Sequence, residues 1–127
     1  MQLGRIGIVV VLEQIQPHVV GLGLEGGNLD HSARLAEDFA AAGDEPTAQV
    51  CRLVGREEEA HVRFAARWFR RFTGGLDFDR WRAALPPPLT PTILAGRPLA
   101  RAARARCGMD ARFLDALERW TCPSSGS

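Results

Sequence analysis

A glutamate and a histidine that stand three residues apart, Glu58 and His61, are the side chains of this sequence best suited to metal chemistry. On a helix, residues at i and i+3 project side by side. The pair can therefore offer one carboxylate oxygen and one imidazole nitrogen to the same metal ion. A Glu–His hydrogen bond in a protein core is the alternative interpretation, and spacing alone leaves both open.

The residues around this pair form an amphipathic pattern. When each residue advances roughly 100°, one face collects His61 with Val50, Val54, Glu58, Ala65, Trp68 and Phe72. The opposite face collects Glu59 and five arginines, Arg52, Arg56, Arg63, Arg67 and Arg70. We therefore predict one continuous helix over residues 44–73, capped by Asp44 and ended by Gly74, with Glu58 and His61 turned inward. Glu57 also lies near His61, so it is a rival or second ligand by position, and the interpretation we favour is an acid on the helix flank.

Helical patterns dominate from Asn28 onward, so the predicted fold class is all-α. A helix capped by Asn28 or Asp30 should stop at Gly43. A short helix should follow Asp77, and two more are predicted over residues 98–107 and 110–120. The prolines of residues 86–98 predict an extended connector between them.

The N-terminal residues show a different pattern. A β-branched run predicts a strand or irregular structure at residues 6–12, and residues 18–27 predict a helix weakened by glycine. His18 would then lie in a loop or at a helix start. The predicted organisation is a divergent N-terminal segment at 1–17, a partial helical bundle at 18–120 and a disordered tail at 121–127.

Composition narrows the class of protein. The 127 residues carry a net charge of +1 and have ordinary globular composition. The three cysteines, Cys51, Cys107 and Cys122, form no CxxC pair, which favours a reducing cytoplasm over a zinc or disulfide scaffold. The apolar run after Arg5 is too short to span a membrane. Arg97, Arg101, Arg104 and Arg106 lack interleaved aromatic residues and are interpreted as a solvated face, so we expect no nucleic-acid binding.

The order of several short blocks resembles the ferritin-like family designated domain of unknown function 455. These blocks are AAGD at 41–44, EEAHV at 58–62, RWF at 67–69, LPPPL at 85–89, GRPLARAARARCGM at 96–109 and FLDALERW at 113–120. Glu25, Leu29 and Asp30 match a further block. The resemblance covers about residues 20–120. It implies a ferritin-like bundle in which Glu25, Glu58 and His61 are metal ligands and iron, in a di-iron centre, is the cofactor.

The family's first two helices, which carry the other half of the ligands, have no counterpart in this sequence. A di-iron centre in such a bundle draws on six side chains, whereas this chain offers three. We therefore expect a homodimer in which two copies complete the bundle. The resemblance implies a di-iron oxidoreductase or a remnant of one, and the alternative is a helical interaction module without metal.

Overall fold

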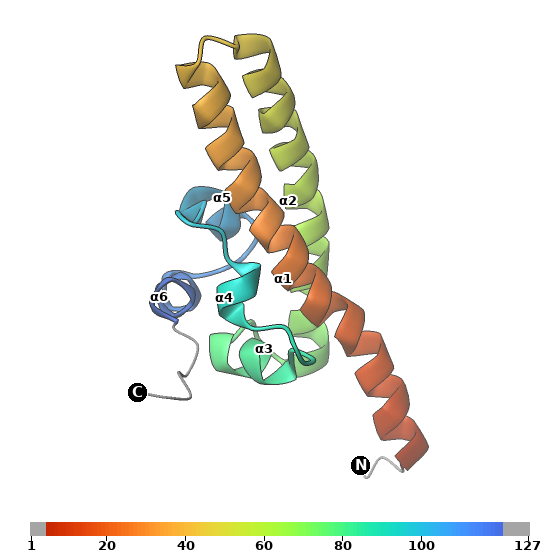
Figure 1. Ribbon diagram of the computed structural model, residues 1–127. Coiled ribbons are helices and arrows are strands. Elements are labelled where there is room, and N and C mark those ends of the chain that lie inside the picture. Colours follow the sequence, from red (N-terminus) through yellow and green to blue (C-terminus); the bar gives the residue numbers. More distant parts are fainter. Residues whose placement is uncertain (1–4, 121–127) are drawn as a thin grey trace.

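The computed structural model describes the backbone of residues 5–120 and the side chains of residues 16–120. Within these residues it contains six helices and no strand, which confirms the all-α prediction. The two long helices, α1 (Arg5–Ala41) and α2 (Glu45–Thr73), form an antiparallel hairpin (Figure 1). The four short helices gather on one side of it: α3 (Phe78–Ala84), α4 (Pro91–Leu94), α5 (Arg101–Arg106) and α6 (Ala111–Arg119).

The helix predicted over residues 44–73 is confirmed. The Asp44 carboxylate accepts a hydrogen bond from the backbone N–H of Thr47 at 3.1 Å, which satisfies a free donor of the first turn. Gly74 ends the helix with φ of 86°, a left-handed conformation that glycine adopts without steric cost. These two local signals define both ends of α2.

The first helix is longer than the sequence predicts. It runs without interruption through Pro17, so the predictions of a strand or irregular structure at 6–12 and of a cap at Asn28 or Asp30 are wrong. The preference of β-branched residues against a helix amounts to only a few tenths of a kcal/mol per residue. Packing outweighs it from Val19 onward, because Val19, Leu22 and Leu29 are buried in the common core.

The glycines of α1 let other segments approach the helix closely. A β-carbon at Gly27 would lie 2.6 Å from the backbone oxygen of Leu94, and one at Gly26 would lie 2.9 Å from Arg104 Nη1. Both distances are too short for a real contact. The glycines interpreted as a weakness of this segment are thus the residues that admit α4 and the Arg104 side chain. The connector around α4 is not fully extended, because Pro91–Leu94 form a helical turn that packs on α1.

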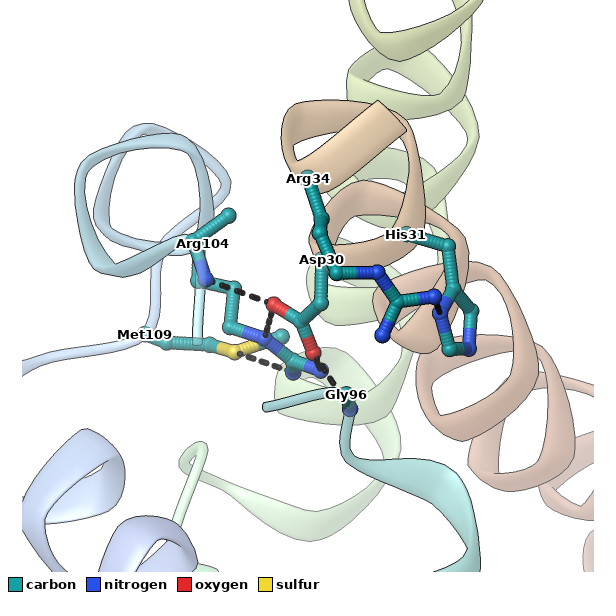
Figure 2. Close-up of polar contacts among 7 residues, drawn as sticks. Asp30, His31, Arg34, Gly96, Arg104 and Met109 are labelled. Atoms are coloured by element: carbon teal, nitrogen blue, oxygen red, sulfur yellow. Dashed lines mark hydrogen bonds and ion pairs between the residues drawn. The ribbon is translucent and has the colours of Figure 1, made fainter. Parts of the chain in front are cut away.

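A buried ion pair joins α1 to α5 (Figure 2). Arg104 donates from Nε to Asp30 Oδ1 at 2.9 Å and from Nη2 to Asp30 Oδ2 at 2.6 Å. The same carboxylate accepts from the backbone N–H groups of Gly96 and Ala100. Both side chains are almost fully buried. Asp30 is therefore a core residue inside α1, and the prediction that Arg104 lies on a solvated face is wrong.

The other three arginines of residues 97–106 also form ion pairs or hydrogen bonds. Arg101 pairs with Asp115 and Glu118, Arg97 donates to the backbone oxygen of Glu118, and Arg106 pairs with Glu59. These contacts tie α5 to α6 and to α2. Around them, Trp81 and Phe113 fill the core between the short helices and the hairpin, and Trp81 Nε1 donates to the backbone oxygen of Val19 at 3.1 Å.

We predict that Asp30→Ala lowers the free energy of unfolding by about 3–5 kcal/mol, because it leaves the Arg104 charge buried without a partner. Urea unfolding followed by circular dichroism measures this loss. The control is Asp115→Ala, which removes an exposed partner of Arg101 and should have little effect. If Asp30→Ala does not fold, the smaller loss in the free energy of unfolding that we expect for Asp30→Asn is measured instead. Equal stabilities of the Asp30 and Asp115 variants would contradict the prediction.

Candidate metal site

The structure brings together the three side chains predicted as metal ligands. Glu25 comes from α1, and Glu58 and His61 come from adjacent turns of α2. His61 Nδ1 lies 3.6 Å from Glu25 Oε1 and 3.5 Å from Glu58 Oε1. One ligand atom from each residue lies within 4.8 Å of the other two. Ligands bonded to one metal at about 2.1 Å are separated by roughly 3 Å, so small side-chain rotations suffice to enclose an ion.

The electrostatics of this cluster favour a cation. Two carboxylates lie beside one imidazole, and Glu58 Oε2 is buried with no hydrogen-bond partner. An unpartnered buried carboxylate oxygen is costly, and a metal ion is one of the few groups that satisfies it. Carboxylate oxygens combined with an imidazole nitrogen suit iron, manganese or zinc. The residues present therefore fit a metal ion.

The prediction that His61 faces inward is wrong. Its side chain is 58% exposed, whereas that of Glu58 is 19% exposed. The face of α2 that packs against the rest of the chain is rotated away from His61, and its buried residues are Ala48, Glu59, Val62, Ala65, Ala66 and Phe69. Val50 and Val54, predicted on the buried side, are exposed. The cluster thus lies at the border between the buried face of α2 and an open one.

Glu59 lies on the packed face of α2. The sequence pattern assigns it to the solvated face, but it is buried and Arg106 Nε donates to its Oε1 at 2.7 Å. The Cys107 thiol contacts the backbone oxygen of the same residue. Burial raises the pKa of the Cys107 thiol, and the negative charge of Glu59 adds to this effect. Because its carboxylate is held by Arg106, Glu59 does not belong to the metal cluster, and neither does the exposed Glu57.

An aromatic layer follows the cluster along the hairpin, and sequence reasoning did not find it. His18 lies inside α1, two turns before Glu25, and stacks on Trp68 and Phe72 with ring centroids 6.1 and 6.3 Å apart. Phe64 meets the His18 ring edge-on. The seven-residue spacing from His18 to Glu25 and from His61 to Trp68 is the signal that places this layer beside the cluster.

Together these features define an all-α protein built on a long helical hairpin that carries a carboxylate–histidine cluster. The family model described as Protein of unknown function (DUF455) matches residues 16–115, and the chain belongs to this family. This confirms the resemblance to domain of unknown function 455, while the ferritin-like character of the chain stays a prediction. No curated protein and no solved structure matches the chain significantly. Among the helices described here, none is long and apolar enough to cross a membrane.

We predict that in the folded protein iodoacetamide alkylates Cys107 more slowly than Cys51. The thiolate is the reacting form, and burial both raises the pKa of the Cys107 thiol and shields its sulfur, whereas Cys51 is only partly buried. Pulse labelling at pH 8 with peptide mass spectrometry measures both rates, and unfolding in urea should make them converge. The raised pKa keeps the Cys107 thiol protonated in the folded state to a higher pH than in the unfolded chain. The free energy of unfolding should therefore fall as the pH rises above about 9. Equal labelling rates in the folded protein would contradict this view of Cys107.

Proposed function

We propose that this chain is a ferritin-like metalloprotein in which Glu25, Glu58 and His61 bind iron as part of a di-iron type centre. One observation carries the proposal. Three metal-ligating side chains from two antiparallel helices converge, and one of their carboxylate oxygens is buried without a partner.

The arrangement of the ligands supports a ferritin-like site in particular. In di-iron bundles, a glutamate on one helix and a Glu-x-x-His pair on its neighbour face the same metal. Here Glu25 on α1 and the Glu58–His61 pair on α2 have this relationship. The pair at i and i+3 also explains why His61 can point along α2 toward Glu58 while Glu25 approaches from the side.

Iron bound by such residues would supply redox chemistry with dioxygen at open coordination positions, which makes an oxidoreductase the proposed class of activity. The chain itself supplies the positions of the ligands. Glu58 is largely enclosed by packing, which limits its rotation, while Glu25 and His61 are more exposed and free to adjust around the ion. The stacked rings of His18, Trp68 and Phe72 give the neighbouring part of the hairpin an apolar surface.

A helical interaction module without metal is a second candidate. The observation in its favour is the open face of α2, where Val50 is 59% and Phe64 57% exposed. Exposed apolar surface of this kind marks a binding surface. The two candidates differ in one property, because only the first requires a metal ion at Glu25, Glu58 and His61.

We predict that the metal-free protein binds ferrous iron under anaerobic conditions with a stoichiometry near one per chain. Isothermal titration calorimetry, with Mn²⁺ as an oxygen-insensitive substitute, measures it. Removing a ligand by Glu58→Gln or His61→Ala should weaken binding by more than the roughly 10–100-fold effect of an outer-sphere change. Glu37→Gln is the matched control, since it removes an exposed carboxylate of α1 that lies outside the cluster. No binding, or binding unaffected by His61→Ala, would refute the metal site.

A further inference from the structure

One face of α2 carries apolar side chains that no other part of the described residues covers. Val50, Val54 and Phe64 are 59%, 42% and 57% exposed, and Trp68 and Phe72 are only partly buried. Successive positions on this face alternate steps of four and three residues: Val50, Val54, Glu57, His61, Phe64 and Trp68. This is the heptad spacing with which one helix packs along another. The face is therefore shaped to receive a helix.

The open face is complementary to itself. His61 lies at the midpoint between Val50 and Phe72. If two α2 helices pair antiparallel about a twofold axis near His61, Val50 of one copy lies opposite Phe72 of the other, and Val54 lies opposite Trp68. Small β-branched side chains then meet large aromatic ones at both ends of the contact, and the same contacts repeat through the symmetry.

The same axis would bring two metal clusters together. Each copy supplies Glu25, Glu58 and His61, so the pair offers four carboxylates and two imidazoles. This number and type of ligand is the set that holds two metal ions in a four-helix bundle. Without cations, four carboxylates at one interface repel each other and are costly to bury. Pairing and metal binding should therefore depend on each other.

We propose that a second copy of this chain covers the open face of α2 and that this homodimer is stabilised by metal ions bound between the two hairpins. The inference rests on the proposed metal site and names its partner. The two α1–α2 hairpins form a four-helix bundle, and each copy contributes three ligands to a shared centre. The short helices of each copy gather on one side of its hairpin (Figure 1), where Arg106 and Cys107 contact Glu59. Because Glu59 lies about 200° from His61 around α2, these helices stay on the outer side of the pair.

The test is sedimentation velocity of the full chain, first metal-free and then with ferrous iron under anaerobic conditions. We expect iron to tighten the dimer on the order of tenfold or more, as for other coupled equilibria. Phe64→Ser should weaken the iron-bound dimer, whereas Ile93→Ser should not, since Ile93 is an equally exposed side chain of α4 outside this face. Circular dichroism checks that both variants are folded.

The reciprocal measurement is iron affinity. Because linkage is mutual, Phe64→Ser should weaken iron binding by a factor similar to its effect on iron-dependent dimerisation, although Phe64 is not a ligand. A monomer that binds iron normally would overturn the dimer and leave the metal site standing. A monomer that binds no iron would overturn both. A dimer that forms equally without iron, or in His61→Ala, would refute the shared centre.

Discussion

Asp30 and Arg104 place a charged pair in the interior, where each ion alone would cost several kcal/mol. The cost is offset only if both carboxylate oxygens are fully hydrogen-bonded, and here the Arg104 guanidinium and the backbone N–H groups of Gly96 and Ala100 achieve this together. These hydrogen bonds therefore hold α5, and the loop before it, at one position along α1. Gly26 is part of the same constraint, since any side chain there would collide with Arg104.

The position of α5 also agrees with the rotation of α2 about its axis, which buries Val62 and Phe69 in the core. Arg106 lies two residues after Arg104 and reaches Glu59, so this acid turns toward the short helices. With Glu59 fixed, Glu58 falls at the edge of the packed face and His61 falls on the open one. On α1, Asp30 lies five positions after Glu25, which corresponds to about 140° around a helix. Glu25 therefore points along the edge of α2 while Asp30 points to α5. The buried pair and the apolar packing of α1 on α2 are therefore consistent with one arrangement of the three residues of the metal cluster.

The sequence predicted the features that depend on local signals. The ends of α2 followed from Asp44 and Gly74, and the short helices at 101–106 and 111–119 fall within the two ranges predicted for them, 98–107 and 110–120. The grouping of Glu25 with Glu58 and His61 came from the family resemblance, because no local rule joins residues on two helices. The errors concern long-range packing. Asp30 and Arg104 are 74 residues apart, and nothing near either one shows that they pair.

Local sequence patterns also did not predict how α2 is rotated about its own axis. Its apolar residues cover two adjacent faces, and a single periodic pattern cannot say which of them packs within the chain and which stays open. Burial of Val62, Ala66 and Phe69 in the core decides this, and Glu59 pairs with Arg106 on the same side of the helix. The outcome gives the helix two roles, since one face builds the core with Val62, Ala66 and Phe69, and the other carries His61 among exposed apolar side chains.

Anomalous diffraction from crystals of the protein soaked in Mn²⁺ would test the metal site most directly, because it locates the ion independently of any activity. The cluster geometry predicts an anomalous peak about 2.1 Å from a carboxylate oxygen of Glu25, one of Glu58 and a ring nitrogen of His61. A peak only at other carboxylates, or no peak with the three side chains ordered, would contradict the assignment of Glu25, Glu58 and His61 as metal ligands.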